Sequence, residues 1–299
     1  MSGYRLAYVS PRGVEYALND NTVSFLRRDG MVGFEPLDVD LPGYRRPLRD
    51  GVRKIGRPYT APRTCGVLTD VLHDSHAELA AYIAARVHAV NPYEDEENPG
   101  ALKVYTPDGR TRQIDVWPTS FPSCNFNGPV VCALGYRFYA PYPFFYDPVL
   151  QEATFALSTP GGITFPITFP ITFAPTTIDT TETISNDGEV ATWPVITIYG
   201  PGDDPIITND TSGAVMDLTN DSGISLDTDD YVIVDMAEAT IYLHDDDTPA
   251  NSGYIPHKRT TASTFWQLVV GDNDINVTMD NVTVGSVKLA WTEYYRSGF

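Results

Sequence analysis

Clustered aspartates are the side chains of this sequence that could most directly do chemistry. They form three groups: Asp203 with Asp204, Asp227 with Asp229 and Asp230, and Asp245 with Asp246 and Asp247. A glycosidase needs two carboxylates across a cleft, one with a raised pKa, and Ca²⁺ prefers clustered carboxylate oxygens. All three groups lie in predicted turns, where Asp commonly bends and caps the backbone, and none matches the EF-hand pattern. We interpret them as turn residues, with calcium binding and an acidic β-rich hydrolase as alternatives.

The histidines add no recognisable site. His73 and His76 lie three residues apart and would need a third ligand to hold a metal ion. His244, beside Asp245, is only half of a catalytic dyad, and a single histidine after a strand is commonly a strand-end residue. The sequence contains no GxSxG, phosphate-loop or dinucleotide-binding motif. We therefore predict no enzyme: no catalytic residue, no metal site and no cofactor.

The three cysteines, Cys65, Cys124 and Cys132, have no CxxC spacing and indicate neither a disulfide scaffold nor a zinc site. We expect them to be small core residues of a protein assembled in a reducing cytoplasm. The first residues contain no apolar signal core, and no run approaches the length of a membrane span. Membrane insertion is not expected.

The elements that must position these residues are mostly strands. Residues 190–199 alternate between two faces, and both faces carry apolar side chains, which predicts a strand between two layers of a sandwich. Further strands are predicted at 4–9, 14–18, 23–26, 65–72, 102–105, 110–116, 130–139, 206–209, 231–235, 239–243, 265–270, 275–279 and 286–291. Residues 30–36 and 41–62 are predicted to be loops. The Thr-Phe-Pro-Ile repeat at 164–171 is predicted to be an edge strand or a connector.

A single helix is predicted at Ser75–Val90, where Leu79, Ile83, Val87 and Val90 form one apolar stripe. Ser75 and Glu78 have the spacing of a capping box, and Asn91-Pro92 ends the pattern. With 299 residues, 42% hydrophobic and 12% aromatic, the chain suits two folded domains. The Pro-rich and aromatic segment 140–148 is the expected crossing between them.

Charge is distributed unevenly along the chain. Residues 1–150 carry 16 Lys and Arg against 17 Asp and Glu, a net charge of −1, whereas residues 151–299 carry 4 against 22, a net charge of −18. So acidic a half would repel nucleic acid and anionic membranes. The positive charge is concentrated in one loop-rich stretch, which indicates either a DNA-facing patch or, since the half as a whole is neutral, an inter-subunit or solvated surface. Its candidate contact residues are Arg45, Arg46, Arg49, Arg53 and Arg57.

Ordered blocks in the second half resemble the distal tail proteins of long-tailed bacteriophages. They include Trp193-Pro194, Ile198-Tyr199-Gly200, residues 205–209, residues 211–213, residues 227–231, residues 263–268, Gly271-Asp272-Asn273 and residues 287–291. Several ordered blocks are far more specific than one short motif. In the first half, Arg49-Asp50-Gly51 and the Ala-Pro-x-Pro-aromatic-aromatic segment at residue 140 are similar to the same family.

This resemblance implies a mainly β protein with an N-terminal ring-forming domain containing one helix, residues 1–145, and a C-terminal galectin-like β-sandwich, residues 146–299. It implies a structural component of the virion tail tip, assembled in the host cytoplasm. Six copies would form a ring that joins the tail tube to the baseplate and serves as a docking platform. Its neighbours would be the tail tube protein, the tape-measure protein and the tail hub protein, with DNA only passing through.

A carbohydrate-binding module for host attachment is the alternative function. Trp193, Trp266 and Trp291 are its candidate sugar-stacking residues, since exposed aromatic rings stack on sugars. Their positions in alternating strands favour the reading that they are core aromatics instead. The sequence leaves this choice open.

Overall fold

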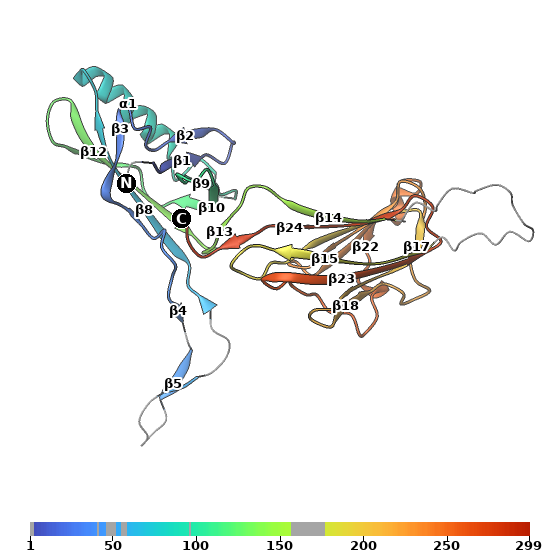
Figure 1. The fold of residues 1–299 in the computed structure, drawn as a ribbon. Helices are drawn as coiled ribbons and strands as arrows, with labels where there is room; N and C mark the ends of the chain where they lie inside the picture. Colours follow the sequence, from blue (N-terminus) through green and yellow to red (C-terminus); the bar gives the residue numbers. More distant parts are fainter. Residues whose placement is uncertain (1–2, 41, 46–51, 55–58, 96, 157–176) are drawn as a thin grey trace, which may run out of the picture. The chain divides into compact units, whose positions relative to one another are not determined.

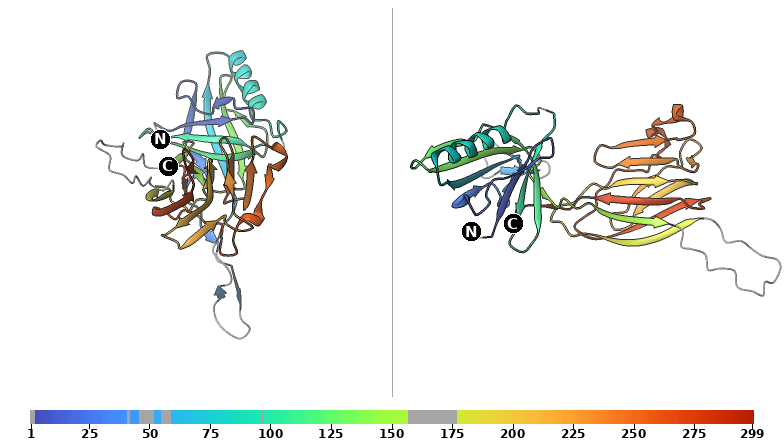
Figure 2. Two further views of the ribbon diagram at one scale, coloured as in Figure 1. Left: turned by 90° about the vertical axis from the view of Figure 1, so that its right-hand side faces the viewer. Right: turned by 90° about the horizontal axis from the view of Figure 1, so that it is seen from above.

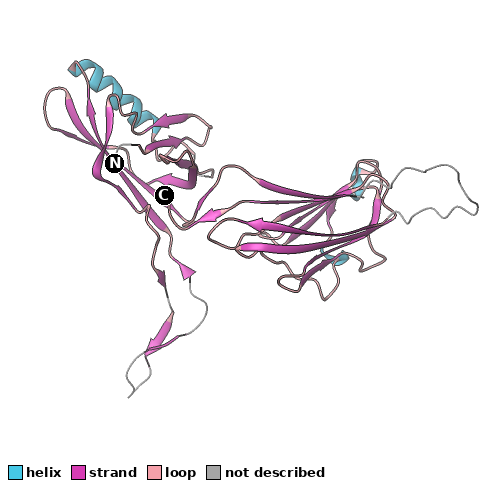
Figure 3. Ribbon diagram, in the orientation of Figure 1, coloured by secondary structure: helices cyan, strands magenta, loops and turns pink. Residues whose placement is uncertain are grey.

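The computed structural model describes residues 3–40, 42–45, 52–54, 59–95, 97–156 and 177–299. The chain divides into two compact units (Figure 1). Unit 1 comprises Met1–Pro148 together with Tyr295–Phe299, and unit 2 comprises Val149–Tyr294. Strands dominate both units, and the described residues contain one α-helix (Figure 3), so the predicted mainly β fold class is confirmed. The Thr-Phe-Pro-Ile repeat lies outside the described residues.

Unit 1 is built on one long antiparallel sheet. Its strand order is β2 (Glu15–Ala17), β1 (Arg5–Val9), β9 (Gly100–Tyr105), β10 (Thr111–Pro118), β12 (Val131–Ala140), β8 (Arg63–Leu72) and β3 (Ser24–Val32). In addition, β11 (Ser123–Phe126) pairs with β12, and β13 (Phe145–Tyr146) pairs with β10. All seven strands predicted for this half are confirmed, with ends that shift by a few residues except for the longer β3.

The sheet of unit 1 closes on its own core. β10 meets β12 where Trp117 and Pro118 lie opposite Tyr139 and Phe138. From the two sides of this junction, Tyr8 on β1 and Phe138 on β12 bring their rings to 5.3 Å in a stacked arrangement. The two parts of the sheet therefore share one core, whose fully buried residues include Leu6, Leu18, Leu102, Val104, Ile114, Val116, Cys65, Val71 and Leu134.

Helix α1 (His76–Ala89) lies along one face of this sheet (Figure 2) and begins as predicted. The Ser75 hydroxyl accepts a hydrogen bond from the Glu78 amide at 3.3 Å, which satisfies one of the free donors of the first turn. Leu79, Ala89 and Val90 are buried in the core of unit 1, so the predicted apolar stripe faces the sheet. The helix thus covers the inner face of unit 1.

Asp20 organises the turn before β3 and gives unit 1 a pH dependence. Its Oδ1 accepts hydrogen bonds from the amides of Thr22, Val23 and Ser24, each at 2.9 Å. Burial alone would raise the pKa of this carboxyl. The hydrogen bonds from the backbone amides lower the pKa by more than burial raises it, so the net pKa lies below the ordinary 3.8. Because the folded pKa is lowered, this stabilisation is complete above pH 3.8 and is lost as the pH falls below it.

We expect Asp20→Asn to lower the free energy of unfolding of unit 1 by about 1 kcal/mol at pH 7, because a neutral amide accepts these bonds more weakly. The variant should also lose less stability than the parent between about pH 4 and pH 2. Urea unfolding at a series of pH values measures both effects. Asp38→Asn, at an exposed position, is the control and should follow the parent. Parallel acid profiles for Asp20→Asn and the parent would contradict the assignment.

Residues 39–60 contain a hairpin where the sequence predicts only a loop. β4 (Val39–Asp40) pairs with β7 (Tyr59–Thr60), and β5 (Gly43–Arg45) pairs with β6 (Val52–Lys54). The loop prediction for residues 41–62 is therefore wrong for β5, β6 and β7. It failed because such short ladders show no alternation of apolar and polar residues, and their register is set by hairpin geometry instead.

Unit 2 is a two-layer sandwich. One sheet has the order β14 (Gln151–Ala156), β24 (Ser286–Trp291), β16 (Val195–Tyr199), β20 (Tyr231–Asp235), β21 (Thr240–His244) and β22 (Gly253–Tyr254). The other has the order β15 (Ile178–Asn186), β23 (Gly271–Asp280), β17 (Gly202–Asn209) and β18 (Ala214–Asp217), with β19 (Ser225–Leu226) beside β17. Two short 3₁₀ turns, η1 (Pro249–Asn251) and η2 (Pro256–Lys258), and β25 (Tyr294–Tyr295) complete the chain.

The inner faces of both sheets form the core of unit 2. Ile196, Ile198 and Val234 come from one sheet, and Ile207 and Val277 come from the other. The strand predicted from residue 190 begins only at Val195, since Pro194 has no amide to donate to a ladder. Only one face of this strand is covered, so the prediction that both faces are buried is wrong.

The strand predicted at 265–270 is also wrong. This segment makes a single bridge, in which Leu268 exchanges two backbone hydrogen bonds with Thr192. The side chain of Asn273 occupies both the amide and the carbonyl of Val269, at 2.9 Å each, so these groups are not available to a neighbouring strand. Among the described residues, no helix is long and apolar enough to cross a membrane.

Candidate functional site

The outer face of β3, β8 and β12 in unit 1 exposes several apolar side chains beside the Arg27–Asp70 ion pair. On β8, Cys65, Val67 and Val71 point into the core, so the alternate side chains point outward. The outward side includes four apolar side chains that remain 40% to 59% exposed, namely Phe25, Val32, Leu72 and Tyr139. We call these four residues the outer face. Exposed apolar side chains gathered on one face commonly mark a protein–protein contact.

A hollow of about 230 Å³ lies in the middle of this surface. Gly66 on β8 lies opposite Arg137 on β12, and Gly135 on β12 lies opposite Leu68 on β8. These two glycines leave neighbouring positions of the sheet without side chains. A Cβ at Gly135 would lie 2.7 Å from the hydroxyl of Ser123 on β11. The lining residues are Asp29, Gly30, Val32, Gly66, Val67, Leu68, Ser123, Gly135, Tyr136 and Arg137.

A wide bulge in β3 borders the hollow. Leu26 pairs with Thr69 and Met31 pairs with Val67, so residues 27–30 all lie opposite Leu68. Gly30 allows this bulge, since a Cβ there would lie 2.3 Å from the Leu68 carbonyl oxygen. A second hollow of about 450 Å³ is lined by Arg27, Arg28, Asp29 and Leu68. The outer face is therefore shaped by the backbone as well as by its side chains.

Arg63, the first residue of β8, is 1% exposed. Its guanidinium donates hydrogen bonds to the carbonyl oxygens of Gly33 (2.6 Å), Glu35 (2.9 Å), Pro143 (2.8 Å) and Arg296 (2.7 Å). Burial lowers its pKa, yet a guanidinium remains charged at neutral pH. The Arg63 side chain thus joins three segments of unit 1, which are the residues after β3, the segment around Pro143 and the C-terminal residues around Arg296.

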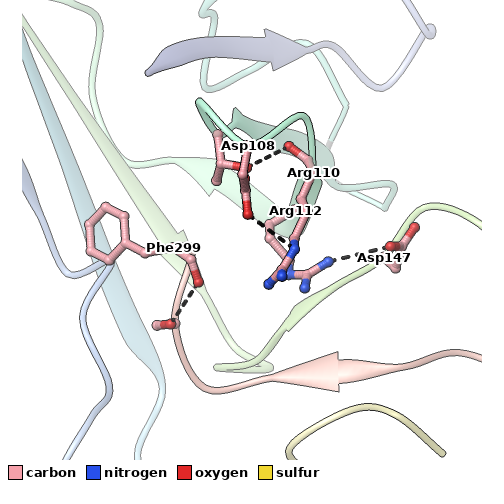
Figure 4. Close-up of polar contacts among 7 residues, drawn as sticks. Asp108, Arg110, Arg112, Asp147 and Phe299 are labelled. Atoms are coloured by element: carbon pink, nitrogen blue, oxygen red, sulfur yellow. Dashed lines mark hydrogen bonds and ion pairs between the residues drawn. The ribbon is translucent and has the colours of Figure 1, made fainter. Parts of the chain in front are cut away.

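Arg112 and the turn between β9 and β10 make further ion pairs in unit 1 (Figure 4). The Arg112 guanidinium lies 3.5 Å from the centroid of the Tyr295 ring. It also pairs with Asp147 at 3.3 Å. In the turn, Asp108 accepts a hydrogen bond from the Thr106 hydroxyl and pairs with Arg110 at 3.1 Å. The contacts of Arg112 thus link β10 to Tyr295 and to Asp147.

The predicted contact arginines fall in the hairpin of residues 39–60. Arg45 belongs to β5 opposite Val52, and Arg53 belongs to β6 opposite Tyr44. The side chains of both, and all of Arg46, Arg49 and Arg57, lie outside the described residues. On the described part of the hairpin, Val39 and Tyr59 are exposed apolar side chains.

The three candidate tryptophans are not brought together. Trp266 and Trp291 are 4% and 6% exposed and belong to the core of unit 2, so neither presents a ring face to solvent. Trp193 is 40% exposed. Of these three rings, a sugar could therefore reach only that of Trp193.

The clustered aspartates bend and cap the backbone. Asp230, which is buried, accepts hydrogen bonds from the amides of Asp227 (3.1 Å) and Asp246 (2.9 Å) and so joins two of the groups. Asp204 accepts from the Ile224 amide, and Asp245 accepts from the Thr248 amide. Within the described part of the chain, no group of three His, Cys, Asp or Glu side chains is placed to hold a metal ion.

The histidines serve structural contacts. The His73 ring lies 5.1 Å from the Tyr82 ring, and the His76 Nδ1 lies 2.9 Å from the Pro129 carbonyl oxygen. His244 stacks on Tyr231 with ring centroids 4.6 Å apart.

Two of the three cysteines are core residues. Cys65 and Cys132 are buried, and burial raises the pKa of each thiol to about 12. Cys124 is exposed on β11, so the prediction of a core position is wrong for it. β11 packs at the margin of the sheet, beside β12 only, and every one of its residues remains exposed.

Comparisons with known proteins agree with this architecture. Residues 187–295 match the family described as the siphovirus-type tail component, C-terminal domain. No curated protein sequence matches. Among solved structures, the Dit protein of phage SPP1, a paradigm of the hub adsorption apparatus in phages that infect Gram-positive bacteria, has a TM-score of 0.63 at 14% identity. That similarity covers 97% of this chain and 98% of the other.

The baseplate of phage P2 in its activated conformation with Ca is a weaker match, with a TM-score of 0.45 and 8% identity over 96% of this chain and 97% of the other. The expected resemblance to distal tail proteins is confirmed by the family match and by the full-length fold. Residues 187–295 are therefore similar to the C-terminal domain of the siphovirus-type tail components.

Proposed function

We propose that this protein is a structural component of the phage tail tip, in which unit 1 forms a ring of six copies between the tail tube and the baseplate. The observation that carries the proposal is the outer face of unit 1, which exposes Phe25, Val32, Leu72 and Tyr139 beside a glycine-floored hollow. A single folded chain gains nothing from this exposure, whereas a neighbouring copy could bury it. The fold shared with a tail hub protein supports the same assignment.

A ring requires two different patches on each copy, because each subunit contacts its neighbours head to tail. Unit 1 offers the outer face as one patch and the hairpin of residues 39–60, with Val39 and Tyr59 exposed, as the other. Of the candidate arginines, Arg45 and Arg53 belong to the strands β5 and β6 of this hairpin, and Arg46, Arg49 and Arg57 lie outside the described residues. We assign the hairpin of one copy to the outer face of the next.

The acidic half belongs on the outside of such a ring. Residues 151–299 carry a net charge of −18, so copies of unit 2 repel one another, whereas residues 1–150 are nearly neutral and can associate. Unit 2 then serves as a docking platform for other baseplate proteins. The neighbours of the ring are the tail tube, tape-measure and tail hub proteins, DNA passes through without being bound, and the protein acts without an enzymatic activity of its own.

Replacing Val32 or Leu72 with Asp should block ring assembly. A charged side chain at the centre of an interface commonly costs about 2 kcal/mol or more, which weakens assembly by roughly thirtyfold. Both side chains are exposed, so the folding stability should change by only about 0.5 kcal/mol. Light scattering combined with negative-stain imaging measures the number of copies in the assembly. If the purified parent protein is a monomer, incorporation of each variant into phage tails is measured instead.

Val284→Asp is the matched control, because Val284 is an exposed valine of unit 2. This variant should assemble like the parent. Folded Val32→Asp and Leu72→Asp variants that both assemble normally would remove the outer face from the interface.

A further inference from the structure

The outer face of the six-stranded sheet in unit 2 carries an unassigned aromatic surface. On β16, Ile196 and Ile198 point into the core, so Thr197 and Tyr199 point outward. Cross-strand register places further rings on this side. We call the set of Tyr199, Tyr231, Tyr242, His244 and Tyr254 the tyrosine face.

The rings lie in two neighbouring rows. In the first row, Tyr199 pairs with Tyr231 and Tyr231 pairs with His244, and the ring centroids are 6.1 Å and 4.6 Å apart. In the second row, Tyr242 pairs with Tyr254, with centroids 5.3 Å apart. Thr197 and Ile233 precede Tyr242 in the second row, and the two rows lie two residues apart along the strands, so all of these side chains share one face of β16, β20, β21 and β22.

Sheet stability accounts for only part of this arrangement. Cross-strand aromatic pairs stabilise a sheet, which explains the stacking of Tyr231 on His244. It does not explain why Tyr199 and Tyr254 remain 41% and 70% exposed at the two ends of the patch. The outer face of the opposite sheet shows the contrast, because there Thr183 bonds Asp274 and Asn276 bonds Thr181, and the polar side chains satisfy one another.

The chemistry of the patch selects an uncharged, hydroxyl-rich ligand. Tyrosine combines an apolar ring with a polar hydroxyl and loses little conformational entropy on binding. Thr197 lies beside the rings, and the nearby charges of Lys288 and Glu152 neutralise each other at 2.8 Å. The net charge of −18 in this half of the chain disfavours anionic polymers. A sugar presents an apolar C–H face and a rim of hydroxyls, which matches this surface.

We propose that the tyrosine face is a binding surface for a neutral glycan, which stacks its sugar rings on the exposed rings of Tyr199 and Tyr254. This site goes beyond the structural role of the ring, and it uses none of the tryptophans Trp266 and Trp291. Stacking contacts of this kind give weak affinity per copy, and several copies held in one assembly would strengthen it through avidity.

Calorimetric titration of the full-length protein with short neutral oligosaccharides of glucose, galactose and N-acetylglucosamine tests the proposal, with a glycerol-phosphate oligomer as the anionic probe. At least one neutral oligosaccharide should bind. Tyr199→Ala and Tyr254→Ala should each weaken that binding roughly three- to tenfold, because each removes one stacking ring. Tyr254→Phe should bind like the parent, since the ring is retained.

Tyr93→Ala is the matched control, because Tyr93 is an exposed tyrosine of unit 1, and this variant should bind normally. Both test positions are exposed, so the variants are expected to fold, which circular dichroism verifies. The proposal is overturned if no neutral oligosaccharide binds, if only the anionic probe binds, or if the tyrosine variants bind unchanged. It is also overturned if they alter the mass of the protein in solution, since this result would assign the tyrosine face to a contact between copies.

Discussion

Replacing Arg63 with Met should lower the free energy of unfolding of unit 1 by about 3–5 kcal/mol. The variant removes the four hydrogen bonds that the buried guanidinium donates to backbone carbonyls. A methionine fills much of the volume but leaves these buried oxygens without donors, and each one then costs about 1–3 kcal/mol before relaxation. Arg63→Lys should also be destabilising, because a single ammonium cannot reproduce the geometry of the guanidinium.

Hydrogen exchange followed by mass spectrometry is the measurement to make, since each unit has its own core and its own peptides. Peptides of unit 1 should lose protection in Arg63→Met, while peptides from the core of unit 2 should not change. Arg137→Met is the control, because Arg137 lies exposed on the outward side of β12. Equal protection of unit 1 in the Arg63→Met variant and the parent would show that the anchor has no energetic role.

Asn273→Ala should lower the free energy of unfolding of unit 2 by about 3 kcal/mol, which is the largest effect expected for this unit. Asn273 is fully buried, accepts a hydrogen bond from the Val269 amide, and donates to the carbonyls of Val269 (2.9 Å) and Gly271 (2.8 Å). Removing the amide leaves three backbone groups unpaired inside the protein. The segment 265–270 lacks a neighbouring ladder, so we expect it to lose protection first.

Asn276→Ala provides the comparison on the same strand. Asn276 also bonds side chains, those of Asp179 and Thr181, but it does so at the surface, where water replaces the lost partners. The Asn276→Ala variant should lower the free energy of unfolding of unit 2 by only about 0.5 kcal/mol. Urea unfolding monitored by tryptophan fluorescence reports mainly on unit 2, which contains three of the four tryptophans. Similar costs for the two asparagines would contradict the role assigned to Asn273.

Local patterns in the sequence were sufficient for most of the elements. Helix α1 begins at its predicted cap, because Ser75 and Glu78 are near neighbours and the apolar stripe has the helical period. β20 and β24 have the predicted bounds, because their alternation reports directly on which face is buried. The ordered blocks of the second half likewise predicted the resemblance to the tail-component family whose C-terminal domain residues 187–295 match.

Contacts between distant residues could not be read in this way. Whether residues 265–270 form a strand depends on Asn273, and whether Cys124 is buried depends on the position of β11 in the sheet. The four carbonyls that Arg63 joins lie up to 233 residues away in the chain. No local pattern records such a separation.

The sequence by itself determined the classes of element, the separation into a neutral and an acidic half, and the tail-component resemblance, because these depend on composition and on the order of near neighbours. Only the tertiary structure decided which residues form surfaces. It buried two of the three candidate tryptophans, and it aligned Tyr199, Tyr231 and His244 from three strands into one row. Strand register brings such residues together, and register is fixed by the packing of the whole sheet rather than by any single strand.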